Sequence, residues 1–554
     1  MLNFYQGPIQ FSKHLFVGID ALARRRFMSI LVVFFLSFGG SWLWALLRGI
    51  PIPYVHDEFS YLLAGDTFAH GRVTNPTHPM WEHFETFHEL MKPTYMSKFP
   101  PGQGLFLAVG QVIFGHPIYG VWLSSALMCA AICWMLYAWI SPRWALIGGL
   151  VAVLQFGIFT YWSQSYWGGA VAAMGGALVF GALPRILKTQ RIRDALWLGL
   201  GCAVLANSRP LEGFLVAIPV GCLVLPWKIR WEEVFSVEHM RRRIVLAKFI
   251  KRIVLPLSII LFITILGIGA YNKQITGDSK IFPHFLYDNT YSSVPLFIFQ
   301  PLGPSPHLNH IIMGTYEQYF LKMHYIEKRT MESFVESMQK DSFRLLKFFF
   351  GFPLAIPSLV ILLLFLRYQR MPLRCIVAIF ILLCEYGSVS YKASPHSLSS
   401  LTCFAVLLIT IGLRGLFWLS FRKMQAGPAL IIFLIGLQLL LNIILTPVQP
   451  AVRSLANGSS QINLPKIFSR EALKNILMKR GGKYLVIVKY PLSHHYFWEW
   501  VYNDAGIDHA PIVWARDMGT TRDAKLLNYF KDRQVLFIDI VWDIKNYPLY
   551  CARQ

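Results

Sequence analysis

Charged side chains are scarce in this chain of 554 residues. They make up 15% of it, whereas 55% of the residues are hydrophobic. Ordinary soluble domains carry about 25% charged residues. So long a chain with so little charge cannot cover a water-facing surface, which excludes a single soluble globular domain. The high apolar content equally excludes a disordered or fibrous protein.

Cysteine motifs and internal repeats are also missing. None of the eight cysteines forms a Cys-x-x-Cys pair, and seven lie in or at the ends of apolar runs. We therefore interpret them as packing residues rather than as a disulfide framework. No repeat of about 20–50 residues is visible, so a transporter built from inverted repeats gains no support.

Long apolar runs dominate the sequence instead. A helix needs roughly 20 mostly apolar residues to cross a bilayer. Eleven runs are candidates, and the fifth and sixth are short enough to be re-entrant. They are 27–47, 118–140, 144–161, 166–183, 195–208, 212–227, 253–271, 346–366, 373–390, 397–414 and 427–446. We expect a polytopic α-helical membrane protein with about 11 transmembrane helices.

The formal net charge of +23 is unevenly distributed between the connecting loops. Counted with the N-terminal segment, the loops on one side of the predicted spans carry 23 Lys and Arg but only 5 Asp and Glu. Basic loops mark the cytoplasmic side of a membrane protein. The sequence therefore predicts a cytoplasmic N-terminus and an extracytoplasmic C-terminus, and binding to nucleic acid is not needed to explain the charge.

Three segments are predicted on the outer side. They are a first outer loop at 48–117, a second outer loop at 272–345, and the region 447–554 after a membrane domain at 1–446. The last region alternates predicted helices at 469–479 and 521–531 with strands at 484–490, 511–515 and 534–540. This order predicts a small α/β domain with partly parallel strands, serving as structural support or for docking an acceptor.

The first outer loop opens with two adjacent carboxylates, Asp57 and Glu58, just after the first span. Acids beside hydrocarbon are costly unless they are paired or solvated, so their placement indicates a function. The alternative is an ordinary helix start, where acids favour the helix dipole. Between Glu58 and Lys98 the loop holds four histidines, His70, His78, His83 and His88. Lys98-Phe-Pro-Pro-Gly follows, ahead of an apolar stretch, 105–114, that is too short to span. Lys98 could contact a lipid phosphate or could reach from a span end toward the membrane surface.

These features together resemble the C-type glycosyltransferase (GT-C) superfamily, especially protein O-mannosyltransferases and the lipid A aminoarabinose transferase. The resemblance is specific in 54–104, although this chain has one residue more between the lysine and the prolines. A similar pattern occurs in uncharacterised bacterial inner-membrane proteins treated as glycosyltransferases of this superfamily. It rests on His56-Asp-Glu-Phe-Ser-Tyr61, Asn75-Pro-Thr-His-Pro79, Ser97-Lys-Phe-Pro-Pro101, Trp167-Gly-Gly-Ala170 and Asn207-Ser-Arg-Pro210.

The resemblance implies an enzyme of the bacterial inner membrane. It would transfer a hexosyl or pentosyl group from a polyprenyl-phosphate donor to a lipid, glycan or protein acceptor, on the outer face and with inversion. Asp57 would be the general base and Glu58 would orient the acceptor. Lys98 and Arg209 would bind the donor phosphate.

Other polar residues are predicted to lie near the outer membrane boundary. Arg209 and Glu212 could bind a ligand or form a structural pair, and the aromatic turn with Trp167 could hold a sugar or belong to a membrane belt. An outer turn with Tyr391 and His396 could face the same cavity or be merely exposed. The further candidates for substrate binding are His56, Tyr61 and His78.

No histidine or acid spacing resembles a zinc signature, so we expect no metal and no cofactor. Weak binding of Mg²⁺ or Mn²⁺ by the mixed Asp, Glu and His side chains is the alternative. Two other function classes stay open beside a glycosyltransferase. A transporter or flippase would disperse polar residues along midplane helices, and a non-catalytic assembly protein would not need the acidic pair.

Overall fold

A computed structural model describes residues 18–53, 55–224, 246–355, 358, 394–418, 420–421, 424–445, 470–491 and 494–540. Six helices in these ranges are long and apolar enough to cross a membrane. They are Arg26–Arg48 (α2), Ile118–Trp139 (α6), Ala170–Thr189 (α8), Leu246–Thr276 (which contains α12, Leu255–Thr276), Ser399–Phe417 (which contains α19, Thr402–Phe417) and Gly427–Leu445 (α20).

The predicted count of eleven spans is not confirmed. Three further apolar helices coincide with predicted spans but are shorter: α7 (Pro142–Ala152, continued by a π-helical turn to Gly157), α9 (Ile192–Ala206) and α10 (Pro210–Val224). The run 346–366 starts inside α16 (Met331–Phe350), which ends at Gly351 with a positive φ of 67°. The rest of that run lies mostly outside the described residues, as does all of 373–390.

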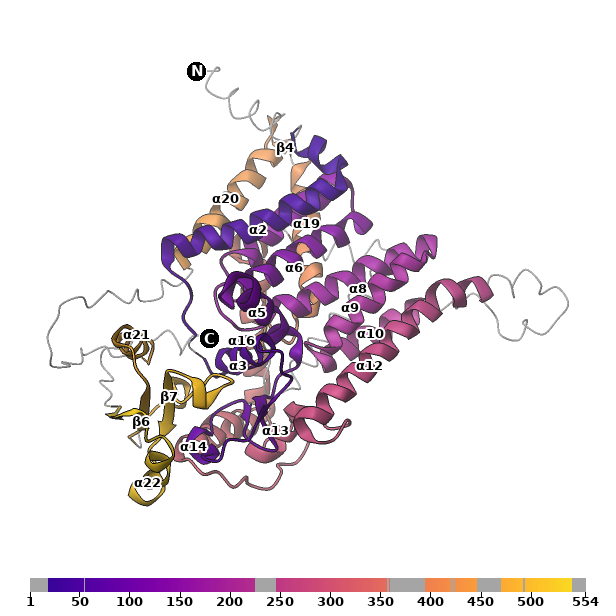
Figure 1. Cartoon of the computed structure of the whole chain (residues 1–554). Helices are drawn as coiled ribbons and strands as arrows, with labels where there is room; N and C mark the ends of the chain where they lie inside the picture. The colour runs from indigo at the N-terminus through magenta and orange to yellow at the C-terminus, as the bar shows by residue number, and fades with distance from the viewer. Residues whose placement is uncertain are drawn as a thin grey trace, which may run out of the picture.

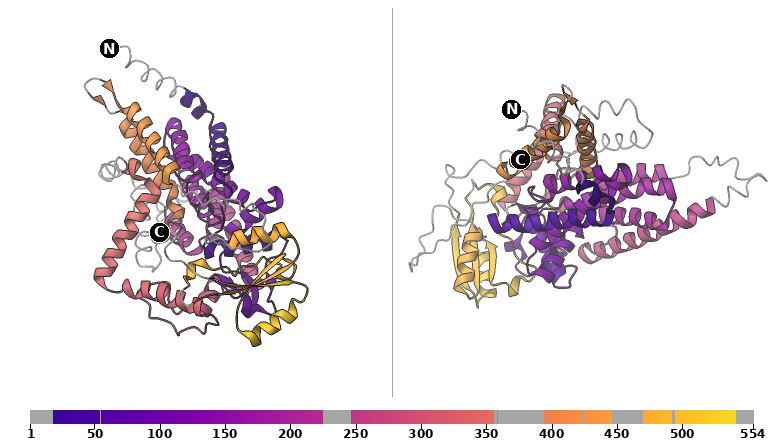
Figure 2. Two further views of the ribbon diagram at one scale, coloured as in Figure 1. Left: turned by 90° about the vertical axis from the view of Figure 1, so that its left-hand side faces the viewer. Right: turned by 90° about the horizontal axis from the view of Figure 1, so that it is seen from above.

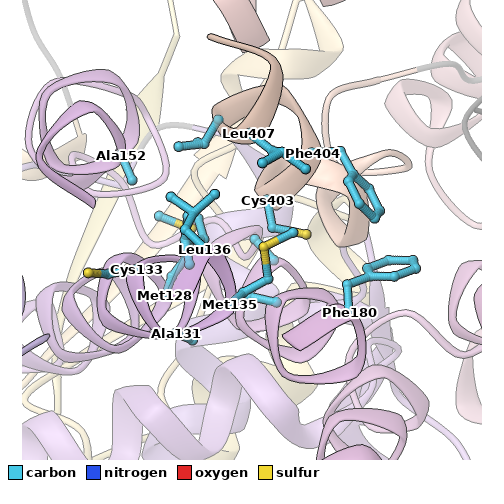
Figure 3. Packing of buried hydrophobic residues seen from close by; sticks show 14 of the residues in the cluster. Met128, Ala131, Cys133, Met135, Leu136, Ala152, Phe180, Cys403, Phe404 and Leu407 are labelled. Atoms are coloured by element: carbon cyan, nitrogen blue, oxygen red, sulfur yellow. The ribbon is translucent and has the colours of Figure 1, made fainter. Parts of the chain in front are cut away.

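A tightly packed core joins α6, α7, α8 and α19. Figure 3 shows side chains of these helices interlocking, and the Phe180 and Phe404 rings are 4.3 Å apart. In α6, 72% of the apolar segment is buried inside the protein. The buried share is only 6% for Leu246–Thr276 and 11% for α20. Soluble monomers rarely expose apolar surfaces as long as those two helices present. The hydropathy of the sequence identifies both the buried and the exposed helices, but it does not tell which of them form the packed core.

The first outer loop folds into α3 (His56–Ala69), a small antiparallel sheet and α5 (Pro101–Phe114). The sheet has the order β1-β3-β2, formed by Asn75–Pro76, Thr94–Ser97 and Glu89–Leu90, and α4 (Trp81–Phe84) lies between β1 and β2. Glycine allows α3 and α5 to pack closely. A Cβ atom on Gly65 of α3 would lie only 2.7 Å from the Cβ of Leu107 in α5, which is too close for any larger residue. The outer face of α5 exposes Leu105, Val112 and Ile113.

The second outer loop contains short helices, namely α13 (Pro283–Tyr291), α14 (Ile311–Thr315), η5 (Tyr316–Lys322) and α15 (Met323–Glu327), and ends in α16. In Figure 1, α13 and α14 lie beside the C-terminal domain, while α8, α9, α10 and α12 run side by side away from it. The two views of Figure 2 also place the C-terminal domain next to the outer loops, at one end of the molecule.

The C-terminal domain forms as the sequence predicts. Strands β6 (Tyr484–Lys489), β7 (Ile512–Arg516) and β8 (Gln534–Asp539) form a sheet of order β7-β6-β8 in which both pairs are parallel. Helices α21 (Arg470–Arg480) and α22 (Thr520–Tyr529) pack with it. Two short 3-10 turns, η7 (Tyr496–Trp498) and η8 (Ile507–His509), lie in the connection from β6 to β7.

Candidate functional site

Asp57 stands in the first turn of α3. Pro51 and Pro53 keep the chain extended after α2, and the helix resumes at His56. The Asp57 side chain is 24% exposed, and its Oδ2 is 3.8 Å from Nε2 of His88, whose side chain is only 4% exposed. The carboxylate therefore faces water on one side and an imidazole on the other.

His88 has a strained backbone. Its φ of +63° lies in the left-handed region, which is uncommon for residues other than glycine. Three hydrogen bonds hold it there: its N–H donates to the Tyr287 hydroxyl at 2.9 Å, and its carbonyl accepts from Ser60 Oγ at 2.6 Å and from Lys98 N at 3.1 Å. Strain sustained in this way is typical of functional positions. Sequence reasoning noted this histidine but did not pair it with Asp57.

Glu58 points into the protein. It is buried, and it accepts hydrogen bonds from the backbone N–H of Val55 at 3.0 Å and of Tyr166 at 2.9 Å. The first bond closes a capping box at the start of α3, and the second ties α3 to the aromatic turn before α8. Both oxygens thus bind backbone, whereas the sequence suggested an orienting contact with the acceptor.

Lys98 is buried beside Asp288 of α13. Its Nζ is 3.2 Å from Asp288 Oδ1 and 4.3 Å from the ring centre of Tyr287. His284 Nε2 lies 3.1 Å from the other Asp288 oxygen. Burial raises the pKa of the Asp288 carboxyl, but the charges of His284 and Lys98 outweigh this and hold the pKa below its ordinary value. No sequence pattern pointed to this partner, because it lies 190 residues away along the chain.

Arg209 precedes α10 and lies next to the start of α5. The Asn207 carbonyl accepts a hydrogen bond from the Gly102 N–H at 2.8 Å, which brings the Asn-Ser-Arg-Pro and Lys-Phe-Pro-Pro-Gly motifs together. Arg209 is 26% exposed, and its guanidinium is 4.0 Å from buried Glu212. The two motifs lie far apart in the sequence, but they are neighbours in the structure.

Tyr61 links Asp57 to Arg209. It is buried one turn after Asp57 and stacks on Phe99, with ring centres 4.4 Å apart. Burial raises the pKa of Tyr61 to about 12, Arg209 opposes the rise, and Asp57 adds to it. Since both charges act on one hydroxyl, the carboxylate and the guanidinium lie within electrostatic range of the same point.

The outer turn with His396 belongs to the same neighbourhood. His396 is buried, and its ring centre is 4.5 Å from that of Trp167 and 5.1 Å from that of Tyr161. Burial lowers the pKa of His396 well below its ordinary value, and the nearby charge of Arg209 lowers it further. Tyr391, predicted beside it, lies outside the described residues.

Two predicted site histidines contact the C-terminal domain. His56 Nε2 is 2.7 Å from the Tyr496 carbonyl. His78 accepts a hydrogen bond from the Met80 N–H at Nδ1 (2.9 Å), and its Nε2 is 3.0 Å from Asp508 Oδ1. His56 stays beside Asp57 because it adjoins it in α3, whereas the His78 ring is bound in a domain interface.

Within the ranges that the structure describes, no three His, Cys, Asp or Glu side chains are grouped so that they could hold a metal ion. No protein-family model matches this chain, and no curated protein matches it. The geometry and the sequence resemblance are what indicate a function. A partly accessible carboxylate beside an imidazole can accept a proton, and two cations nearby can stabilise an anion.

Proposed function

We propose that this chain is a membrane glycosyltransferase that moves a sugar from a polyprenyl-phosphate donor to an acceptor hydroxyl on the outer face. The observation that carries the proposal is the position of Asp57, a water-accessible carboxylate flanked by His88; its charge and that of Arg209 both act on Tyr61. The likeness of residues 54–104 to GT-C enzymes supports the same assignment.

The proposed chemistry is a single displacement. Asp57 accepts the proton of the acceptor hydroxyl while its oxygen attacks the anomeric carbon, and His88 orients the carboxylate. The bond from the anomeric carbon to the phosphate oxygen breaks on the opposite side, which inverts the configuration. Polyprenyl phosphate leaves with the bonding electron pair.

Arg209 is the proposed main contact for the leaving phosphate. It is more exposed than Lys98, and its planar guanidinium can bind two phosphate oxygens at once. Lys98 contributes positive charge from a buried position, where a donor phosphate would compete with Asp288 for the ammonium. The charge of Arg209 also acts on Tyr61 and His396, so both side chains belong to its neighbourhood.

A membrane location is part of the proposal. It is supported by the six long apolar helices and by the bare apolar surfaces of Leu246–Thr276 and α20. The basic loops predict that residue 235 and residue 554 lie on opposite sides. Activity reporters fused at these two positions should give opposite signals, and equal signals would contradict the proposed topology.

Donor turnover tests the activity directly. The purified full-length protein, reconstituted in nanodiscs, is incubated with polyprenyl-phosphate mannose, glucose and aminoarabinose in turn, together with a membrane extract as the source of acceptors. We expect release of polyprenyl phosphate from at least one donor, dependent on Asp57. No release from any of the three would contradict the proposal.

A further inference from the structure

Aromatic rings from three distant parts of the chain meet beside the start of α3. One pair comes from the first outer loop, one from η5 in the second outer loop, and one from η7 in the C-terminal domain. They are His56, Phe87, Tyr316, Phe320, Tyr496 and Phe497. The domain that follows the membrane helices thus reaches the residue next to Asp57.

Buried rings form the base of this cluster. His56 stacks on Phe87 with ring centres 4.2 Å apart and planes 9° apart, and it stacks on Phe497 at 5.3 Å and 25°. Tyr316 is buried among them, 5.0 Å from Phe87. Burial raises the pKa of the Tyr316 hydroxyl, and the charge of Asp57 adds to the rise, so this hydroxyl lies within range of the proposed base.

Partly exposed rings form the outer layer. Phe320, Tyr496 and Phe497 each retain some accessible surface. The ring centre of Phe320 is 5.1 Å from that of Phe497 and 5.9 Å from that of Tyr496. Through these ring contacts, the three partly exposed side chains connect His56, the neighbour of Asp57, to the C-terminal domain.

We propose that Phe320, Tyr496 and Phe497 form an acceptor subsite that binds a saccharide, so that the acceptor is a glycan. This rests on the proposed sugar transfer, because an acceptor hydroxyl must reach Asp57. The faces of aromatic rings are electron-rich and attract polarised C–H groups, which sugar rings present on their own faces. The three rings themselves belong to the second outer loop and the C-terminal domain, and only the last turns of α12 (Tyr271 and Ile275) join their cluster, so the rings lie beyond the apolar length of that helix, which favours a water-soluble glycan over a lipid chain.

Other contacts also dock the C-terminal domain on the first outer loop. Phe59 of α3 stacks on Tyr502 at 4.0 Å, and the Tyr95 hydroxyl donates to the Asn503 carbonyl at 2.9 Å. The Asp66 carboxylate accepts from the Ala505 N–H at 2.9 Å. Because these contacts hold the segment after η7 in addition to the ring contacts, a change at the partly exposed ring of Phe320 should alter the surface without releasing the domain.

Saturation-transfer-difference NMR tests the subsite without any donor. Maltotetraose, cellotetraose and chitotetraose are each added to the full-length protein in nanodiscs. Saturation should reach the ring C–H protons of at least one of them. Phe320→Ala and Tyr496→Ala should weaken that binding by about 3- to 10-fold, as expected for loss of one aromatic contact. Tyr319→Ala is the matched control, because Tyr319 is an exposed neighbour in the same helix, and it should bind as the wild type does.

Two further variants separate binding from folding. Phe320→Trp keeps an aromatic face and should retain binding, whereas Phe320→Leu keeps apolar volume without the π-face and should weaken binding as much as Phe320→Ala does. Absence of saturation transfer to all three glycans would overturn the subsite, as would equal binding by Phe320→Leu, Tyr319→Ala and the wild type. Glycan binding without donor turnover would contradict the proposed activity alone, and turnover without glycan binding would overturn the subsite alone.

Discussion

The charged residues of the first outer loop are paired differently on the side facing the C-terminal domain and at the start of α3. Toward the C-terminal domain, His83 lies 3.3 Å from Asp523 with both side chains buried, and buried His78 lies 3.0 Å from Asp508, which is 47% exposed. At the start of α3, Asp57 is 3.8 Å from its histidine and Arg209 is 4.0 Å from Glu212, and each is about a quarter exposed.

This difference separates structural from functional charge. A close buried pair recovers the cost of desolvation only through its own partner, so replacing one member destabilises the fold. A longer contact at a water-accessible position can be exchanged for contact with a ligand. Replacements at Asp57 and Arg209 should therefore reduce activity, and those on the docking side should reduce stability.

Asp57→Asn should have the largest effect. Asn is nearly isosteric with Asp but cannot accept the proton at neutral pH, so transfer should fall by about 10²–10⁴-fold. Thermal unfolding and membrane insertion should be unchanged. Transfer measured with the donor identified above is the readout, and turnover near that of the wild type would show that Asp57 is not the base.

Arg209→Ala should lower the turnover number by roughly 10- to 100-fold, since hydrogen bonds to charged groups contribute about 1.5–3 kcal/mol. The loss should be mostly in kcat, because the contact strengthens as the phosphate gains charge. Glu212→Gln is the matched control and should keep most of the activity. Failure of Arg209→Ala to accumulate in the membrane would instead support a structural Arg–Glu pair.

Glu58→Gln should reduce stability more than Asp57→Asn does. The amide presents one N–H group to a backbone N–H that now donates to carboxylate oxygen, and such a buried mismatch costs about 1–3 kcal/mol. A lower unfolding temperature for Glu58→Gln than for Asp57→Asn checks this. The reverse order, with an inactive but stable Glu58→Gln protein, would move the base assignment to Glu58.

His78→Gln should have the smallest effect, visible as a dependence on pH. Burial lowers the pKa of His78, although Asp508 partly opposes this. The neutral ring therefore stabilises the fold above the unfolded pKa of about 6.5, and this stability is lost as the pH falls toward the folded value. The difference in unfolding temperature between wild type and His78→Gln should shrink from pH 7.5 to pH 5.5, and a constant difference would count against it.

The sequence patterns predicted helices and strands better than they predicted which side chains contact one another. The strands of the C-terminal domain are visible because their apolar runs are short and bounded by turn residues, and α3 begins where the acids indicate. The pairing of Asp57 with His88 requires a left-handed backbone at His88, which the residues around it impose only in three dimensions. The pairing of Lys98 with Asp288 depends on a helix 190 residues later, and local spacing carries no trace of it.

The long helix Leu246–Thr276 has a mechanical consequence for the proposed site. Its 31 residues span about 46 Å, whereas the hydrocarbon core of a bilayer is about 30 Å thick. Its final turns contact the chain before and after Lys98. The Ile275 carbonyl accepts a hydrogen bond from Thr94 Oγ1 at 2.9 Å, and the Tyr271 hydroxyl lies 3.5 Å from the Phe99 carbonyl. We expect that a thicker or thinner membrane, by changing the tilt of this helix, also moves the Lys98 segment that it contacts.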